Sequence, residues 1–271
     1  MSSPVPFSLT LFSTKPAFIR SAVTAGVDEV IVDWEHVGKA ERQRTADTEI
    51  NQDTLTDLRG VRACTNARVI CRINQFSPGT RQEVEHAIAA GADEILLPMV
   101  RSVEDVQAVI DQAGARCGIG ILIETNEAVQ LVERLALLPL SRAYVGLNDL
   151  AIERHQLNIF GSLLDGTLDF IRQPFRVPFG FGGLTLPDSG FPIPCRLLIG
   201  EMARLNCSFS FLRRSFYRNI QGRDLKVEIP ALLNAIQKAR GRSQHEINRD
   251  RTDLESAIRA WSDQMELRQS P

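Results

Sequence analysis

The sequence of 271 residues lacks several features that would assign it to other classes of protein. Its net charge of -2 leaves no surplus of Lys and Arg to attract nucleic acid or anionic lipid. No run approaches the roughly 20 apolar residues that span a bilayer. The N-terminal stretch has no charged segment ahead of its apolar residues, unlike a signal peptide. These absences predict a cytoplasmic protein with no nucleic-acid or membrane partner.

The cysteines form no C-x-x-C pair, and their number, five, is odd. This pattern argues against both a zinc site and a disulfide framework. We interpret the cysteines as reduced and mostly as small buried hydrophobic residues. The chain also has no internal repeat and no low-complexity segment, which excludes solenoid and fibrous architectures.

What the chain does have is a series of short apolar runs separated by segments with helical spacing. With 44% hydrophobic residues, its length suits one large core. The runs cover residues 7–13, 29–35, 68–74, 94–100, 118–124, 142–148, 177–183 and 209–215. Several intervening segments end in Gly, a common helix stop. The alternation predicts an α/β protein, a single-domain (β/α)8 barrel, although the count alone also allows an open doubly wound sheet.

The end of the chain differs from this repeating pattern. We expect the barrel domain over residues 1–240 and a polar extension over 241–271, with a helix over residues 253–267 that has Leu254, Ile258 and Trp261 on one face. Such a helix packs on its own barrel or on a neighbouring subunit. The segments 151–176 and 184–194 are longer than usual connections, and the second is a candidate lid or interface loop.

Polar residues close several of the apolar runs, at the barrel end where active sites form. Glu124 and Asp149 follow neighbouring runs, and two carboxylates together with water and substrate oxygens make a site that suits Mg²⁺ or Mn²⁺. A bound metal polarises a 2-oxo group and stabilises an enolate. A single carboxylate at this position could instead cap the following helix.

Two further strand-end residues suit the same chemistry. Arg72 would place a fixed positive charge near an enolate oxygen, and His36 would carry protons near neutral pH. Taken alone, the arginine could simply pair with a carboxylate, and the histidine could be an ordinary hydrogen-bonded residue. Spacing by itself leaves these alternatives open.

At these residues the sequence resembles the HpcH/HpaI aldolase and citrate lyase family, metal-dependent members of the phosphoenolpyruvate/pyruvate barrel superfamily. The resemblance covers roughly residues 10–150 and rests on five stretches in the family's order: VDWEH, CRIN, AGADEILLPMVRSVED, ILIETNEAV and YVGLNDLA. Five ordered blocks are much more specific than any one of them.

The resemblance implies a role for each matched residue. It implies Glu124 and Asp149 as ligands of Mg²⁺, or of Mn²⁺ or Co²⁺, and Arg72 as the arginine that stabilises the enolate. It implies that His36 is part of the acid–base apparatus, and we take the neighbouring Asp33 and Glu35 as further candidate catalytic residues. It also implies that backbone N–H groups in the turn that begins Gly146, Leu147, Asn148 hold the substrate carboxylate.

The pair Glu35-His36 and the stretch LLPMV favour the aldolase branch, which splits 4-hydroxy-2-oxo acids into pyruvate and an aldehyde. We therefore expect a lyase that acts on a 2-oxo acid and an aldehyde or ketone, and the resemblance implies a homo-oligomer, a trimer or hexamer. Citrate-synthase-like condensation and cleavage of malyl-CoA-like thioesters are alternatives on the same scaffold. An alternative from another class is a catalytically reduced barrel that serves as a binding or scaffold subunit.

One position departs from the aldolase pattern. The Asp that usually pairs with the histidine is replaced by Ala89, so the usual His-Asp dyad is incomplete. Glu85 lies one helical turn earlier, and we interpret it as a solvated surface charge. The general base is therefore unassigned.

The second half of the chain matches the family poorly. Gly183 and the pair Arg213-Arg214 would lie at the rim where barrel enzymes often bind phosphate. Because neighbouring strand residues alternate in direction, at most one of the two arginines should point inward. We hypothesise that one of the two binds an anionic co-substrate, and we take Arg214 as the candidate site residue. A salt bridge from barrel to outer helix is the alternative.

Overall fold

The computed structural model describes residues 6–37 and 53–269, whose strands form one parallel sheet. The strands are β1 (Ser8–Phe12), β2 (Glu29–Asp33), β3 (Arg68–Arg72), β4 (Glu94–Leu97), β5 (Gly118–Ile123), β6 (Arg142–Val145), β7 (Phe179–Phe181), β8 (Gly183–Leu184) and β9 (Phe209–Leu212). Their order in the sheet is β7-β6-β5-β4-β3-β2-β1-β9-β8.

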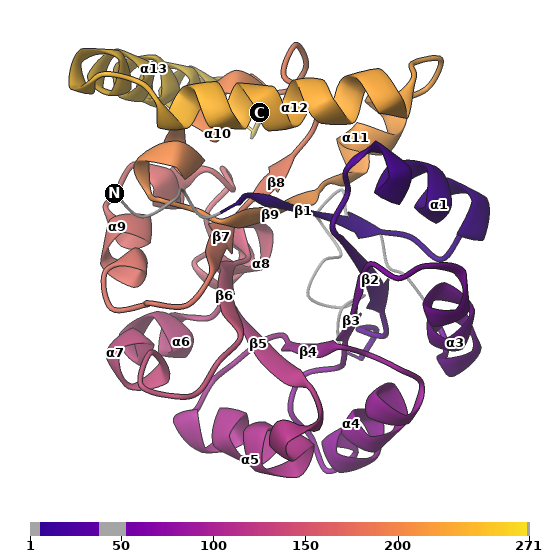
Figure 1. Ribbon diagram of the computed structural model, residues 1–271. Helices are drawn as coiled ribbons and strands as arrows, with labels where there is room; N and C mark the ends of the chain where they lie inside the picture. Colours follow the sequence, from indigo (N-terminus) through magenta and orange to yellow (C-terminus); the bar gives the residue numbers. More distant parts are fainter. Residues whose placement is uncertain (1–5, 38–52, 270–271) are drawn as a thin grey trace.

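Helices alternate with the strands and cover the outside of the sheet (Figure 1). They are α1 (Pro16–Ala25), α3 (Leu55–Cys64), α4 (Thr80–Ala89), α5 (Val103–Ala113), α6 (Asn126–Gln130), α7 (Val132–Leu135), α8 (Leu147–Glu153), α9 (Thr167–Arg172), α10 (Cys195–Arg204), α11 (Arg214–Asn219), α12 (Leu225–Arg240) and α13 (Gln244–Gln269). Two 3₁₀ turns, Gly114–Arg116 and Gly161–Leu163, precede β5 and α9.

The two ends of the sheet meet in one run of chain. β7 and β8 are parts of residues 179–184, interrupted at Gly182, whose φ of 57° is in the left-handed region. β7 pairs with β6 and β8 pairs with β9, so this run joins both ends of the sheet. A backbone bond of 2.9 Å from Ser208 N to Phe179 O supports the closure. The predicted (β/α)8 barrel is confirmed, and the open sheet is wrong.

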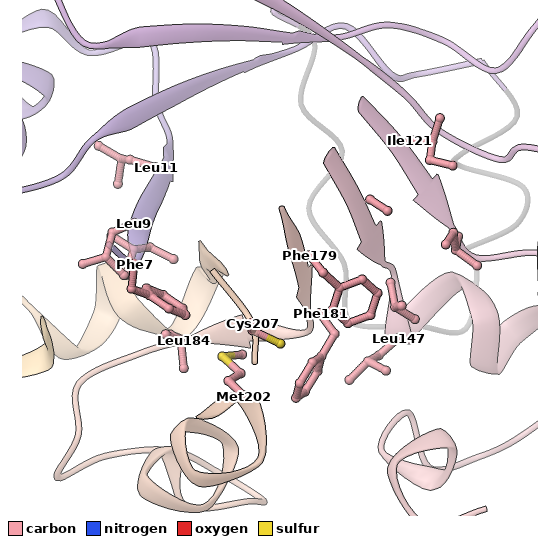
Figure 2. Close-up of a cluster of buried hydrophobic side chains, with 14 of the residues drawn as sticks. Phe7, Leu9, Leu11, Ile121, Leu147, Phe179, Phe181, Leu184, Met202 and Cys207 are labelled. Atoms are coloured by element: carbon pink, nitrogen blue, oxygen red, sulfur yellow. The ribbon is translucent and has the colours of Figure 1, made fainter. Parts of the chain in front are cut away.

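Buried apolar side chains form two layers, one on each side of the strands. The inner layer fills the barrel and consists of Ile31, Ile70, Leu96, Leu122, Tyr144, Phe209 and Phe211. The larger outer layer joins strands to helices, and Figure 2 shows a part of it in which Leu184, Met202 of α10 and Cys207 lie close together. This division follows from the two-residue alternation of side chains along each strand.

At the amino ends of the strands, buried charges fill the barrel. Arg142 begins β6 and donates to both oxygens of Glu29 at 2.6 Å, and its Nε lies 2.6 Å from Glu94. Gly120 makes this possible, because a Cβ there would lie 2.6 Å from the Glu94 carboxylate. Arg68 adds a second cation, 2.8 Å from Glu94. Two cations thus balance two carboxylates at this end.

The predicted C-terminal helix is present and longer than expected. It begins at Gln244, because Ser243 and Glu246 bond each other's backbone and side chain as a helix cap. Leu254 and Ile258 are buried, and α13 packs on α10 of its own barrel. Within the described ranges, no helix has both the length and the apolar character of a membrane span.

Candidate active site

A cavity of about 300 Å³ opens at the carboxyl ends of the strands. Its polar wall includes Arg72, Glu124, Gly146, Asn148, Asp149, Gly183, Arg213 and Arg214. Its apolar wall includes Phe12, Leu122, Tyr144, Leu147, Ile159, Phe160, Phe211 and Tyr217. Eight of the eleven predicted site residues therefore line one cavity, whereas Asp33, Glu35 and His36 do not.

Glu124 follows β5 and is almost completely buried, with 2% of its surface exposed. It does not cap the next helix, since the side chain of Thr125 accepts the bond from Ala128 N in α6. Glu124 Oε1 instead accepts from Met99 N at 2.9 Å. Gly146 leaves room for the other oxygen, because a Cβ there would lie 2.2 Å from Oε2. The carboxylate therefore lies directly against the backbone where β6 meets α8.

The environment of Glu124 disfavours its ionised form. Burial, together with the charges of Asp149 and Glu35, raises the pKa of Glu124 well above its ordinary value, and the Met99 bond and Arg72 oppose the rise only in part. Asp149 lies in the first turn of α8 rather than in a strand. Two carboxylates, Glu124 and Asp149, thus face one cavity, and the ionised form of Glu124 is disfavoured there.

Arg72, the last residue of β3, is held by carboxylates on the side away from the cavity. Its Nε and Nη2 donate to Asp33 at 2.8 and 2.7 Å, and its Nη1 lies 3.3 Å from Glu35. Burial alone would lower the pKa of Arg72, but these carboxylates raise it above its usual range. The predicted alternative, an arginine paired with carboxylates, is therefore correct and also compatible with a place in the cavity wall. Asp33 and Glu35 position Arg72 and do not touch the cavity.

The balance of charge around the cavity fits a divalent cation. Asp33, Glu35, Glu124 and Asp149 lie near the guanidinium of Arg72, and Arg213 and Arg214 line the same cavity, so four carboxylates face three guanidinium groups. The described residues contain no group of three or more His, Cys, Asp or Glu side chains arranged around a metal position. A pair of carboxylates completed by water and substrate oxygens is nevertheless how proteins usually hold Mg²⁺. Glu124 and Asp149 are the side chains able to hold it.

His36 lies outside the cavity wall and is exposed. Its Nδ1 lies 2.8 Å from the carbonyl of Trp34, and since a carbonyl only accepts, Nδ1 carries the proton. Its backbone N–H donates to Asn74 Oδ1 at 2.9 Å, and Asn74 in turn donates to Glu83 at 2.6 Å. Sequence reasoning missed Glu83 and Asn74, although the CRIN stretch contains the latter.

The surface assignment of Glu85 is correct. Its carboxylate accepts from Arg116 at 2.7 and 2.8 Å and lies on the outside of the barrel, between α4 and the turn before β5. The bonds to Arg116 and Gln112 lower the pKa of Glu85 to about 2. Glu85 therefore does not take over the role of the Asp that the aldolase pattern has at the position of Ala89.

Both arginines after β9 line the cavity, so the prediction that at most one would point inward is wrong. Arg213 continues the inward series of Phe209 and Phe211, but β9 ends at Leu212 and Arg214 begins α11, where strand alternation no longer applies. Gly183 makes room for Arg213, since a Cβ there would lie 2.8 Å from the Arg213 Cβ. Arg213, which was not among the candidate site residues predicted from the sequence, thus lines the cavity together with Arg214.

Several apolar lining residues were also missed. The rings of Tyr144 and Phe211 stack at 3.8 Å between centroids, and Phe12 lies edge-on to Phe211 at 5.3 Å. Phe12 also contacts Arg72, whose Cζ lies 5.2 Å from the ring centre. The only sequence signal for these residues is that they lie near the ends of strands, at the alternate positions whose side chains face the barrel interior. They make one side of the cavity apolar, and a less polar surrounding strengthens electrostatic interactions.

The fold and the site together describe a parallel α/β barrel whose cavity, at the carboxyl ends of the strands, contains the carboxylates Glu124 and Asp149 and the guanidinium of Arg72. The family comparison is more specific. The HpcH/HpaI aldolase/citrate lyase model matches residues 7–156, more than half of the sequence, and the chain belongs to this family. Membership places it in the aldolase and lyase class that gives the family its name. A search of curated proteins found no match.

Solved structures resemble the whole barrel at low sequence identity. RipC from Yersinia pestis is 15% identical, with a TM-score of 0.56, and the alignment covers 90% of this chain and 100% of that one. The citrate synthase SbnG is 17% identical, with a TM-score of 0.58 and coverage of 86% and 94%. A citrate lyase from Burkholderia xenovorans LB400 is 15% identical, with a TM-score of 0.59 and coverage of 97% and 84%. At such identities these structures support the fold alone.

Proposed function

We propose that this protein is a divalent-metal-dependent carbon–carbon lyase of the aldolase type, which makes or breaks a bond to the enolate of pyruvate or a related 2-oxo acid. The observation that carries the proposal is the buried, negatively charged cluster around Glu124, facing a small cavity beside Arg72. A protein that keeps several carboxylates together out of water without a cation loses stability. The cluster is therefore best explained by a cation that binds there.

In this proposal each residue of the chain has one task. Glu124 and Asp149 hold the metal, which would act as a Lewis acid on the 2-oxo group. Arg72 places a fixed guanidinium beside the same oxygen as negative charge develops, and Asp33 fixes its orientation through two hydrogen bonds. N–H groups in the first turn of α8, at Leu147 and Asn148, have no acceptor within the helix and donate to the substrate carboxylate.

We further propose that His36 handles the proton through solvent. Its Nδ1 donates to Trp34, which leaves Nε2 as the atom that accepts a proton. Because the ring does not border the cavity, a water molecule must connect the two. Replacement of His36 by Ala should then lower the rate of carbon–carbon cleavage without abolishing it, whereas loss of Glu124 should abolish it.

The direct test is cleavage of 4-hydroxy-2-oxo acids in the presence of Mg²⁺, Mn²⁺ or Co²⁺, with released pyruvate measured by a coupled dehydrogenase. We expect metal-dependent release by the wild type and none by Glu124→Ala. A titration of the same two proteins with Mn²⁺ separates this proposal from a scaffold role. Equal metal binding by wild type and Glu124→Ala would contradict a metal site at Glu124.

A second candidate is condensation with a carboxylated ketone to give a citrate-like acid. It is favoured by the guanidinium of Arg213, which has no carboxylate partner in the described part of the chain and suits an acidic second substrate. The two candidates differ in their products. Mass spectrometry of reactions that contain pyruvate or oxaloacetate, with either an aldehyde or a carboxylated ketone, distinguishes them.

We also propose a homo-oligomer, a trimer or hexamer. Among the exposed large apolar side chains, Phe191 (73% exposed) lies edge-on to Trp261 of α13, 5.2 Å between ring centroids, and Leu267 (74% exposed) belongs to the same helix. Contiguous exposed apolar surface marks contacts between proteins, and we propose that these residues contribute to such a contact. Light scattering coupled to gel filtration would measure the mass, and a single monomeric species would contradict the proposal.

A further inference from the structure

Arg213 is half-buried and has an unusual environment for a cation. Its Nε and Nη2 atoms are inaccessible to water and have no hydrogen-bond acceptor in the described part of the chain. These are the same two atoms with which Arg72 holds Asp33. Burial lowers the pKa of Arg213, and no carboxylate offsets that effect. A guanidinium is always charged in proteins, so this side chain has desolvated donors and no counter-ion among the described residues.

A second donor without a partner lies in the wall of the same cavity. The side-chain Nδ2 of Asn148 is buried and makes no hydrogen bond among the described residues. Asn148 is the second residue of α8, and Arg213 follows β9, so the two come from different parts of the barrel wall. Buried donors without acceptors cost stability, and in enzymes they often mark the place of a ligand.

The carboxylates near the cavity do not provide the missing acceptor. Asp33 and Glu35 hold Arg72, and Glu124 and Asp149 form the proposed metal site. Gly183 shows that the chain makes room for Arg213, since any larger residue there would contact the Arg213 Cβ. The environment of Arg213 is therefore one that an acidic ligand would complete.

We propose that Arg213 and the Asn148 side chain form an anion subsite that selects, as the second substrate, a carbonyl compound bearing a carboxylate or phosphate group. This inference rests on the proposed lyase function and deepens it. The 2-oxo acid occupies the metal end of the cavity, and the anionic group of its partner is bound by Arg213. Loss of this contact leaves a desolvated charge unpaired, so the subsite discriminates against neutral partners.

The experiment compares matched acceptors in condensation with pyruvate. Succinic semialdehyde and butanal have the same carbon chain with and without a carboxylate, and glyceraldehyde 3-phosphate and glyceraldehyde make the corresponding phosphate pair. We expect the wild type to prefer one charged member by about 10- to 100-fold in kcat/KM. Arg213→Met should reduce that ratio to near one, and whichever pair shows the preference identifies the group. A wild type that uses both members of each pair equally would overturn the proposal.

Arg218→Met is the matched control. It removes the same charge from an exposed position on α11 outside this cavity, so the preference should remain. A second readout separates ligand binding from a structural role. Because the Nε and Nη2 donors of Arg213 are desolvated and have no acceptor among the described residues, Arg213→Met should raise the melting temperature of the free protein. A lower melting temperature, together with an unchanged acceptor ratio, would show that Arg213 is structural.

A binding measurement keeps this test independent of the proposed reaction. Calorimetric titration with succinate, in chelator and without metal, should show binding to the wild type and to Arg218→Met, and binding weakened at least about 10-fold in Arg213→Met. If the wild type cleaves and condenses nothing but binds succinate through Arg213, the lyase proposal fails and the subsite stands. Equal succinate binding by wild type and Arg213→Met overturns the subsite.

Discussion

At the scale of single residues, the position of the Glu124 carboxylate requires that residue 146 be glycine. A Cβ at Gly146 would lie 2.2 Å from Glu124 Oε2, a distance that forces the carboxylate to move. Gly146→Ala should therefore weaken metal binding by about 10- to 100-fold, the range seen when groups that orient ligands are lost. Titration with Mn²⁺ measures the change.

The control for this variant is Gly60→Ala. Gly60 lies exposed in α3, and a Cβ added there would have no neighbouring atom within 4 Å. Alanine there should leave metal binding unchanged and stabilise the protein by about 0.4–1 kcal/mol, because it restricts the unfolded chain. Wild-type metal affinity in Gly146→Ala would mean that the Glu124 carboxylate is not a ligand in this position.

A second residue-scale prediction concerns the pH dependence of stability. The pKa of Glu124 is raised in the folded protein, so the folded state holds this proton more tightly than the unfolded state does. Ionisation therefore costs stability as pH rises from the ordinary glutamate pKa of about 4.3 to the raised value. In chelator, Glu124→Gln should melt above the wild type near neutral pH, and the difference should shrink towards about pH 4.

Added metal should reverse this order, since only the wild type keeps both carboxylates and a bound ligand stabilises the folded state. Thermal melts across pH, with and without Mg²⁺, make the comparison. Glu133→Gln, at an exposed position, should follow the wild type throughout. A Glu124→Gln protein that melts below the wild type in chelator at neutral pH would contradict the surplus of negative charge.

At the scale of elements, Asn158 connects the cavity wall to the C-terminal helix. Its Nδ2 donates to Ile258 O at 3.1 Å and to Ser262 Oγ at 2.8 Å in α13, and its Oδ1 accepts from Phe160 N at 3.0 Å. Phe160 lines the cavity. Asn158→Ala should destabilise the protein by about 1–3 kcal/mol and raise KM, because the segment before α9 loses its anchor.

Urea denaturation and steady-state kinetics test this prediction together. Asn248, exposed on the same helix, provides the control, since Asn248→Ala removes an amide from α13 without touching the segment before α9. A stable Asn158→Ala with wild-type KM would mean that α13 and the cavity are independent of each other.

The elements were predictable wherever one local rule decides them. Each strand is an apolar run that the barrel buries on both sides, and Glu124 and Arg72 follow because they end or directly follow such runs. The exact end of β9 was not predictable, because Leu212 and Arg213 are equally extended and only α11 determines where the strand stops. The direction of the Arg214 side chain was not predictable for the same reason, because Arg214 belongs to α11 and not to β9.

Other features depend on contacts between distant residues, which no local pattern contains. The hydrogen bond between Asn74 and Glu83 depends on how α4 packs beside the end of β3. That Arg213 has no partner among the described residues depends on the positions of all the residues in the cavity wall. The early start of α13 was predictable in principle, because Ser243 and Glu246 have the spacing of a capping box.

At the scale of the whole molecule, the two ends of the barrel differ in their charge balance. At the amino ends of the strands, Arg142 and Arg68 balance Glu29 and Glu94. Burial raises the pKa of Glu94. Burial also acts to raise the pKa of Glu29, but Arg142, the Thr10 hydroxyl and Arg68 together outweigh it and lower that pKa. The carboxyl ends have a surplus of carboxylates instead. One end therefore stabilises the fold, and the other is where we propose that a cation binds.

This contrast predicts that the two ends respond differently to mutation. Arg142→Met leaves two buried carboxylates with less compensation and should cost about 3–5 kcal/mol, with metal affinity unchanged in the protein that remains folded. Arg134→Met removes an exposed ion pair with Glu104 and should cost less than about 1 kcal/mol. Urea denaturation measures both. A neutral Arg142→Met would contradict the division between a structural and a functional end.

The measurement that tests the central claim most directly is exchange of the methyl protons of pyruvate with solvent deuterium, followed by NMR without any second substrate. If Glu124 and Asp149 hold a divalent cation that stabilises the enolate beside Arg72, the wild type exchanges these protons only when metal is added, and Glu124→Gln does not. Absence of exchange with Mg²⁺, Mn²⁺ and Co²⁺, or equal exchange by Glu124→Gln, would contradict the account.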